Sequence, residues 1–439
     1  MKKIEGFAAA RKALSRPTPA DSYLLSASLK RKLEETFGTA DPEQAVKTII
    51  SEVRNGGDAA IIELTVKIDG VKLTALEVPK NEISSAYRKI DDEVISALRL
   101  AAERIGAFHT AQRDNIWREL TTKDAGQLIR PLERVGIYVP GGTASYPSTV
   151  LMTAVPARVA GVKEIVLATP PGKDGTVPPA TLVAADIAGV ERVFRIGGAQ
   201  AIAALAYGTE SVPKVDKICG PGNIFVVLAK KLVFGAVDID GLQGPSEVMI
   251  VADDTANPEY CAADLLAQAE HDPLASAILI TTSRTLAEEV DRELKKQITG
   301  LSRQSVIDES LNRGVIALVD SLDEAIELAN LYAPEHLSLM IKDAEACLKK
   351  VVNAGCVLIG DAATVVLGDY VAGPSHVLPT GGTARFSSPL NITDFIKFVN
   401  TININKAGLK KLGKAAALLA RAEGLDAHAR AVEKRLNSD

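Results

Sequence analysis

The chain has 439 residues, of which 47% are hydrophobic and 24% are charged, and its formal net charge is −5. This length exceeds one ordinary hydrophobic core and predicts roughly two to four domains, with the composition of a soluble globular protein. The acidic balance argues against a general nucleic-acid binder, and no apolar run approaches the roughly 18 residues that span a bilayer.

The N-terminal segment, residues 1–30, reads as a peripheral extension without the sustained apolar run of a secretory signal. Four cysteines are scattered along the chain without a C-x-x-C pair. This spacing indicates neither a disulfide framework nor a cysteine zinc site, so we predict a reducing, cytoplasmic location. Only five histidines are present, and they include most candidates for imidazole chemistry.

Residues 31–120 read as mostly helical. The stretch DPEQAVKTIISEVRNGG offers Asp41 as the N-cap, Pro42 at the first helical position and a glycine pair as the stop. A second predicted helix ends near His109, which we interpret as a surface or interhelix histidine.

From residue 134 short β-branched runs that close on glycine alternate with helical stretches, as in RVGIYVPGG, EIVLATPPG, RVFRIGG and KVDKICGPG. This alternation is typical of parallel βαβ units, whose ligands bind beyond the carboxyl ends of the strands. The glycines supply backbone amides at helix starts, which form a ready anion site. The dinucleotide fingerprint G-x-G-x-x-G is missing, so the glycines alone leave a phosphate-bearing cofactor undecided.

A second alternating block begins near residue 247, with EVMIVAD, SAILITT, GVIALVD, HLSLMI and CVLIG as its strands and residues 240–246 as a hinge before it. After about residue 391 the chain reads as helical, with Gly424 as a kink. The predicted fold class is therefore α/β, with two αβα Rossmann-like domains built on parallel sheets and small helical N-terminal and C-terminal extensions.

Four stretches carry residues suited to acid–base or metal chemistry. Asn257 and Pro258 start a helix that should run to about His271, which places Gln268 and His271 together in its last turn as metal ligands or as a polar helix end. Glu335 and His336 follow Pro334 at the start of a strand, where they suit general acid–base work or form a solvated turn.

The third stretch is GDYVAGPSHVLPTGGTARFSS, residues 368–388, which we expect to be a long functional loop carrying Asp369 and His376. Glu423 and His428 lie farther on, in AEGLDAHA, where a histidine on a polar helix is usually a surface residue.

Together these stretches closely resemble the histidinol dehydrogenase family. The resemblance covers nearly the whole chain, is strongest over residues 133–433, and rests on motifs that keep the same order. The motifs are ERVGIYVPGGTASYPSTVLM, RIGGAQAIAALAYGT, KICGPGN, GPSEVMIVAD, DLLAQAEHDP, APEHL, GDYVAGPSHVLPTGGTARFSSPL and AEGLDAHARAV.

The resemblance implies an NAD-dependent enzyme that oxidises L-histidinol to L-histidine through an aldehyde, in histidine biosynthesis. It implies one zinc ion per subunit, which holds the substrate by its imidazole and amine. The implied ligands are Gln268, His271, Asp369 and His428. His428 would come from the partner subunit of a domain-swapped homodimer.

The same resemblance assigns His336 as the base that takes the alcohol proton, and Glu335 as the group that activates water for the aldehyde stage. The substrate contacts that it implies are Ser246, Glu423 and His376, together with His336 and the four zinc ligands. NAD contacts map to Tyr138, Gln200 and Asn223. Two departures, Ser375 for a frequent asparagine and Gln243 for a frequent alanine, affect pocket details only.

For the domains the resemblance implies that residues 31–132 and 247–390 form the catalytic and metal-binding αβα domain. Residues 133–246 would form the NAD-binding domain, and residues 391–439 the swapped helical tail. The alternatives are a family member acting on another small alcohol, a zinc hydrolase using Glu335, and a catalytically silent metal-binding protein.

Overall fold

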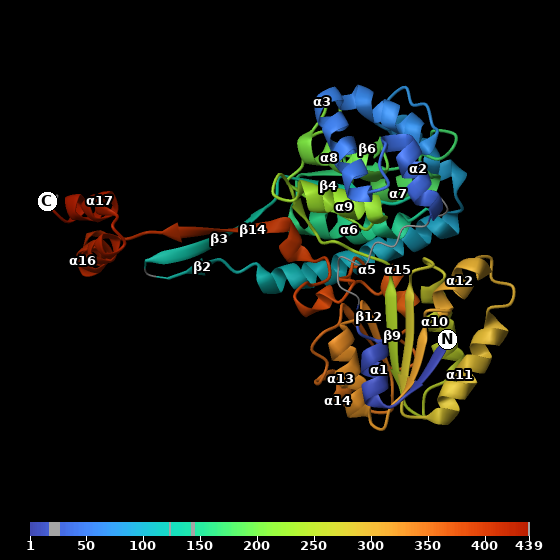
Figure 1. Ribbon diagram of the computed structural model, residues 1–439. Coiled ribbons are helices and arrows are strands. Elements are labelled where there is room, and N and C mark those ends of the chain that lie inside the picture. The colour runs from blue at the N-terminus through green and yellow to red at the C-terminus, as the bar shows by residue number, and fades with distance from the viewer. Residues whose placement is uncertain (17–26, 123, 142–144, 438–439) are drawn as a thin grey trace. The chain divides into compact units, whose positions relative to one another are not determined.

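The computed structural model describes residues 1–16, 27–122, 124–141 and 145–437 (Figure 1). The chain divides into two compact units. The first contains Met1–Thr110 and Leu132–Phe395, and the second contains Ala111–Pro131 and Ile396–Asp439. The helix α5 (Asp92–Ile116) contributes residues to both.

The first unit contains a five-stranded sheet of order β6-β5-β4-β7-β8, in which every pairing is parallel. Its central strands are buried on both faces, as expected where helices cover a parallel sheet. The strands are β4 (Arg134–Tyr138), β5 (Glu164–Thr169), β6 (Arg192–Arg195), β7 (Lys217–Cys219) and β8 (Asp238–Ile239).

Helices pack on both faces of this sheet (Figure 1). On one face α3 contacts α8 and α9, and these helices share a core with strand residues such as Val166 and Phe194. Helices α6 and α7 pack together beside β4 and β5. Helix α4 and the short 3₁₀ helix Tyr87–Lys89 contact α7, whereas α2 contacts α3. The helices are α2 (Ala27–Phe37), α3 (Pro42–Asp69), α4 (Lys80–Ala86), α6 (Pro147–Ala160), α7 (Pro179–Ile187), α8 (Gly198–Tyr207) and α9 (Ile224–Val233).

The first unit also contains a six-stranded, wholly parallel sheet of order β1-β11-β10-β9-β12-β13. Because side chains alternate between the faces of a strand, its residues divide into two cores. The strands are β1 (Lys2–Glu5), β9 (Glu247–Ala252), β10 (Ser276–Thr281), β11 (Val315–Leu318), β12 (His336–Met340) and β13 (Cys356–Ile359).

One face of the six-stranded sheet is covered by α10, α11, α12 and α15, and the opposite face by α1, α13 and α14 (Figure 1). Leu337 and Leu339 point into the core with α13, so His336, Ser338 and Met340 face α10 and α15. The helices are α1 (Phe7–Ala13), α10 (Pro258–Ala269), α11 (Arg284–Gln297), α12 (Gln304–Leu311), α13 (Leu322–Tyr332), α14 (Ala344–Leu348) and α15 (Val365–Tyr370).

The second unit combines an antiparallel three-stranded sheet of order β14-β3-β2 with a helical hairpin of α16 and α17. The hairpin turns at Gly424, whose φ of +75° lies in the left-handed region that favours glycine. The elements are β2 (Leu120–Thr121), β3 (Ala125–Pro131), β14 (Ile396–Ile402), α16 (Lys406–Ala422) and α17 (Asp426–Leu436).

The structure confirms the α/β class, the parallel sheets and every strand predicted in the two alternating blocks. Three expectations differ. The first strand pairs with β11, so residues 2–5 belong to the six-stranded sheet instead of a peripheral extension. The helix α3 packs on the five-stranded sheet, whereas its segment was predicted to belong with residues 247–390. The C-terminal segment begins with the strand β14, which a purely helical reading missed.

The local helix signals in this segment are confirmed. The glycine pair interrupts α3, because Gly57 leaves helical geometry at φ +55° and two helices meet there at a kink. Asp41 caps α3 as predicted, through a hydrogen bond from the Glu43 amide to its side chain.

Candidate active site

The junction between α13 and β12 places the predicted acid–base pair. Pro334 follows the end of α13, and His336 is the first residue of β12. Glu335 and His336 are 6% and 4% exposed, which overturns the alternative of a solvated turn. Their side chains approach each other, with Glu335 Oε2 3.6 Å from His336 Nδ1.

The two ring nitrogens of His336 have different surroundings. Nδ1 lies 3.2 Å from the carbonyl oxygen of Glu247, and because a carbonyl only accepts, Nδ1 carries the proton in this contact. Nε2 lies 3.5 Å from Asp369 Oδ1. This tautomer directs the basic nitrogen of the ring toward Asp369.

The charges of this pair depend on burial and on each other. Burial raises the pKa of the Glu335 carboxyl. For His336 burial disfavours the charged form, but the carboxylates of Glu335 and Asp369 outweigh it and raise the pKa of the imidazole well above its usual value. The ring can therefore hold a proton between two carboxylates and pass it on at Nε2.

Asp369 lies in the last turn of α15, where a long irregular loop was expected. Thr364 caps this helix and also donates to Asp264 Oδ1 of α10 at 2.6 Å, so a side-chain hydrogen bond joins the two helices. Burial works against the Asp369 charge, but the contact with His336 and the charge of that imidazole outweigh it and lower the pKa of the carboxyl.

His376 holds the backbone of Asp369. Its Nδ1 donates to the Asp369 carbonyl at 2.8 Å, and its Nε2 lies 3.1 Å from the Thr149 hydroxyl of α6. Both ring nitrogens are engaged, and burial lowers the pKa of this imidazole. In this structure His376 links α15 to α6 as a neutral ring.

Helix α10 places the two residues of the QAEH stretch differently. Asn257 caps the helix as predicted, but the helix ends at Ala269, so Gln268 lies in its last turn and His271 lies two residues beyond it. Gln268 is 1% exposed, whereas His271 is exposed. The expectation that both share one helical turn is therefore wrong for His271.

The side chains of Gln268, His271 and Asp369 are of types that bind a divalent cation. Gln268 Oε1 is buried and has no hydrogen-bond partner among the described residues, although buried acceptors are nearly always paired. An amide oxygen, an imidazole and a carboxylate form a nitrogen and oxygen donor set that zinc accepts. No three side chains of histidine, cysteine, aspartate or glutamate form a metal-binding cluster within the described part of the chain.

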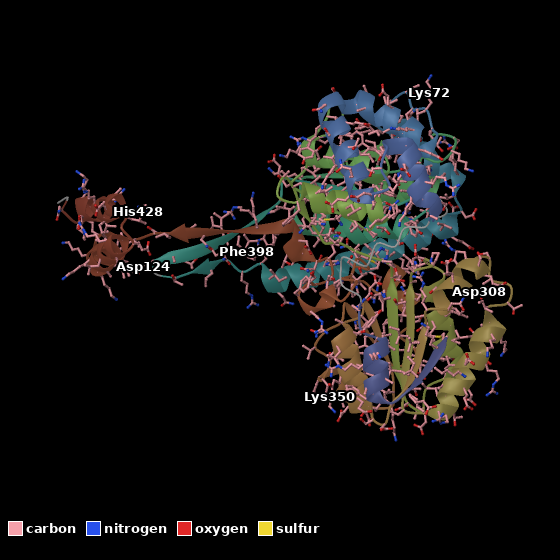
Figure 2. The ribbon with its side chains drawn as sticks, in the orientation of Figure 1. Lys72, Asp124, Asp308, Lys350, Phe398 and His428 are labelled. Atoms are coloured by element: carbon pink, nitrogen blue, oxygen red, sulfur yellow. The ribbon has the colours of Figure 1, made fainter. Side chains whose placement is uncertain are left out.

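Two further predicted residues belong to the second unit. Glu423 is the C-cap of α16, and His428 lies in the first turns of α17 (Figure 2). Both residues are exposed, as a surface position on a polar helix predicts.

The predicted NAD residues lie at the carboxyl ends of strands in the five-stranded sheet. Tyr138 ends β4, is 3% exposed, and accepts a hydrogen bond from the Gly198 amide at 3.0 Å. Burial raises the pKa of this tyrosine to about 12. Asn223 caps α9 by accepting from the amides of Phe225 and Val226, at 3.0 and 3.3 Å.

Gln200 follows β6 in the first turn of α8 and is 1% exposed. Neither its Oε1 nor its Nε2 has a hydrogen-bond partner among the described residues. Such a side chain is costly to bury unless a ligand supplies the partners. This site therefore fits a polar cofactor.

The glycine-rich strand ends also bring backbone segments close together. Gly220 follows β7 at φ +114°, and a Cβ built there would lie 2.0 Å from the Tyr138 carbonyl oxygen. Its amide donates to Asp240 Oδ2 at 2.7 Å, and the buried Lys230 ammonium binds the Gly220 carbonyl and Gln243 Oε1 at 3.0 and 2.9 Å. Gln243 thus helps fix this loop.

Two residues beside the Glu335–His336 pair were not singled out from the sequence. Glu247 is the first residue of β9, directly after the predicted substrate residue Ser246, and is 4% exposed. Arg16 forms an ion pair with it. A carboxylate opening a strand whose other residues are all apolar was a signal for Glu247, whereas nothing in the local sequence indicated Arg16.

The family model of histidinol dehydrogenase matches residues 33–436. The chain belongs to the histidinol dehydrogenase family. It is 58% identical over 437 residues to histidinol dehydrogenase of Dehalococcoides mccartyi strain CBDB1, covering 99% of this chain and 100% of that protein. Identity to histidinol dehydrogenase of Deinococcus radiodurans is 52% over 444 residues, covering 99% and 100%.

A crystal structure of histidinol dehydrogenase from Elizabethkingia anophelis superposes with a TM-score of 0.90 at 37% identity, covering 99% of this chain and 98% of that one. The sequence resemblance to the family is thus confirmed, and the chain is a dehydrogenase of histidine biosynthesis. None of the described helices of this histidinol dehydrogenase family member is long and apolar enough to cross a membrane.

Proposed function

We propose that the enzyme oxidises L-histidinol to L-histidine through L-histidinaldehyde, by two successive hydride transfers to NAD, with one zinc ion per subunit. The observation that carries this proposal is the buried Glu335–His336 pair, whose Nε2 faces Asp369 at 3.5 Å on the sheet face covered by α10. A base, a buried acidic group and two proposed metal ligands, Gln268 of α10 and Asp369 of α15, belong to the sheet face that these two helices cover.

His336 is the base for the alcohol proton. A hydride leaves readily only from an alkoxide-like carbon, so a positioned proton acceptor is needed. With Nδ1 donating to the Glu247 carbonyl, Nε2 is the nitrogen that accepts.

Glu335 serves the second half of the reaction. Burial raises the pKa of its carboxyl toward the range in which it can take a proton from water. Glu335 takes the proton of the water that adds to the aldehyde. Because the nitrogen it approaches, His336 Nδ1, already carries a proton, this proton and the alcohol proton on Nε2 leave to solvent before the second oxidation. His336 then assists the second oxidation.

Gln268, His271 and Asp369, completed by His428 of a second copy, hold zinc, which when bound would hold the imidazole and amine of the substrate as a template. The partnerless Oε1 of Gln268 and the lowered pKa of Asp369 support this set, since both leave an acceptor ready for a cation. Ser246 and Glu423 contribute further substrate contacts.

Tyr138, Gln200 and Asn223 bind NAD, which when bound would accept the hydride. The support is the partnerless amide of Gln200 and the position of all three residues at carboxyl strand ends beside helix N-termini. A glycine-rich edge without G-x-G-x-x-G can provide this site because several helix starts converge on it.

The support for a homodimer comes from the surface of the second unit. Within that unit apolar side chains lie on the surface, with Phe398 48% and Leu419 66% exposed, and Ile402 79% exposed. Exposed apolar residues of this kind mark protein contact surfaces. A second copy that covers them would bring His428 to the metal site. Within the described residues all four cysteines are free, which supports a reducing, cytoplasmic location.

The test is NADH formation after L-histidinol is added to the zinc-loaded enzyme with NAD. The proposal predicts two NADH for each L-histidinol consumed and L-histidine as the product. NADH formed from another small alcohol but not from L-histidinol would replace the substrate. Hydrolysis that needs no NAD, or bound zinc without turnover, would refute the reaction.

A further inference from the structure

Glu247 contacts both members of the Glu335–His336 pair. Its backbone amide donates to Glu335 Oε2 at 2.7 Å, and its carbonyl accepts from His336 Nδ1 at 3.2 Å. Its carboxylate Oε2 accepts from the Glu335 amide at 3.4 Å. One residue thus sets the carboxyl orientation of Glu335 and the tautomer of His336.

Arg16 holds Glu247 in turn. The guanidinium binds the carboxylate with two parallel hydrogen bonds, 2.5 Å from Nη1 to Oε1 and 2.7 Å from Nη2 to Oε2. The guanidinium also lies 3.7 Å from the centre of the Tyr332 ring. Because the guanidinium is paired through two hydrogen bonds and stacked on a ring, it fixes the orientation of the Glu247 carboxylate as well as neutralising its charge. A lysine would not fix the orientation.

The same guanidinium binds the backbone that leads into the catalytic pair. Arg16 Nε donates to the Tyr332 carbonyl at 2.9 Å, at the end of α13. The next residue, Ala333, has φ +53°, the only positive φ of a non-glycine residue in the part of the chain that the structure describes. This strained residue lies two positions before Glu335, so contacts around it decide where the pair points.

The positive charge of Arg16 also compensates the buried carboxylate of Glu247. Glu247 and Glu335 are both buried, and the Glu247 charge adds to the burial that raises the pKa of Glu335. A buried carboxylate without its cation is strongly destabilising, because its water is gone and its partner is missing. The pair therefore couples the segment that follows α1 to a site more than three hundred positions later.

We infer that Arg16 and Glu247 are positioning residues for the Glu335–His336 pair, so that the N-terminal segment is part of the catalytic machinery. This inference rests on the proposed roles of Glu335 and His336. It predicts that breaking the ion pair slows the chemical steps and leaves binding of substrate, NAD and metal intact.

The test compares Arg16→Met with Arg11→Met, a change of an exposed arginine in α1. Arg16→Met should lower kcat about 10–100-fold, as loss of a supporting contact does, with KM for L-histidinol and NAD and the zinc content within about twofold. Arg11→Met should match the unchanged enzyme. An Arg16→Met enzyme with unchanged kcat would overturn the inference.

A second variant separates positioning from folding. Adding Glu247→Gln to Arg16→Met removes the uncompensated charge, so the melting temperature should rise above that of Arg16→Met, while kcat stays low because the paired contacts are still missing. If kcat returns along with the melting temperature, the role is structural and the inference fails. This double variant carries the test if Arg16→Met does not fold.

His336→Asn distinguishes the inference from the proposed function. If His336→Asn loses turnover while Arg16→Met keeps its kcat, only the positioning role is refuted. Retained turnover in His336→Asn would refute the base itself, whatever Arg16→Met does.

Discussion

The two parallel sheets of the first unit present their candidate site residues at opposite strand ends. In the five-stranded sheet Tyr138, Gln200 and Asn223 lie at carboxyl ends, where helix N-termini and glycines expose backbone amides. In the six-stranded sheet Glu247 and His336 open β9 and β12 at their amino ends.

This difference has a physical reason. Beyond a carboxyl end the chain enters a helix N-terminus, whose amides and dipole suit an anionic cofactor. At an amino end the chain often arrives from a helix C-terminus, whose carbonyls and negative dipole favour a cation. The imidazole proton of His336 is held by a strand carbonyl instead, that of Glu247. Gln268, in the last turn of α10, and the junction after α13 both follow this pattern. One sheet is suited to binding a cofactor and the other to metal and proton chemistry.

The largest expected effect tests the second half of this comparison. His336→Asn removes the proposed base but keeps an amide of similar size, so turnover should fall about 10²–10⁴-fold, the usual contribution of a general base. Zinc content, measured by mass spectrometry of metals on the same sample, should not change. Loss of metal together with activity would mean that the imidazole is a ligand instead of the base.

A mixing experiment tests whether the metal site needs a second copy. His428→Asn and His336→Asn enzymes should each be inactive, but in mixed dimers one site regains both residues, so random reassembly should restore about a quarter of the unmutated activity. NADH formation after unfolding and refolding the two chains together measures this. Mixtures that stay inactive, while each chain binds its partner, would place His428 in its own subunit's site.

Two matched glutamines sharpen the comparison. Both Gln200 and Gln268 have buried amide atoms without partners among the described residues. Replacing either with leucine should leave the melting temperature unchanged or raise it, because an unsatisfied polar group is removed. Gln200→Leu should raise KM for NAD about tenfold, and Gln268→Leu should weaken zinc binding about tenfold or more.

If Gln200→Leu weakened zinc binding and Gln268→Leu raised KM for NAD, the assignment of cofactor binding and metal binding to the two sheets would be reversed. A drop in melting temperature with no change in either ligand would show that the glutamines serve packing alone. Kinetic titration of NAD and competition with a zinc chelator, on both variants, provide the measurements.

The smallest expected effect concerns the glycine loop of the five-stranded sheet. Gly220→Ala should lower stability by about 1–3 kcal/mol, since a Cβ would collide with the Tyr138 carbonyl and the positive φ is strained. Gly235, at φ +100° with no atom within 4 Å of a built Cβ, provides the control. Thermal unfolding should show a larger drop for Gly220→Ala than for Gly235→Ala; equal drops would mean that the close approach does not matter.

Much of the fold followed from short-range signals in the sequence. Strands such as EVMIVA were recognisable because buried parallel strands are continuous apolar runs, and Asn257 and Asp41 were recognisable as caps. The pairing of β1 with β11 and of β14 with β3 was missed, because edge strands are short or exposed and their partners lie far away in sequence.

The residues of the candidate site likewise divide into those that the sequence indicated and those that only the folded chain shows. Glu335 and His336 stood out because they are adjacent, whereas the contact of His336 with Asp369 and of Arg16 with Glu247 joins distant segments that only the folded chain brings together. The chain's family membership, seen in ordered motifs, supplied the ligand set that spacing alone left open.

The most direct test of the account is anomalous scattering at the zinc edge from crystals of the metal-loaded enzyme. The proposed zinc site predicts one strong peak per chain beside the six-stranded sheet, within bonding distance of Gln268 Oε1, His271 and Asp369, with His428 supplied by a second copy. A zinc peak elsewhere, with Gln268 Oε1 and the Asp369 carboxylate left uncoordinated, would contradict it.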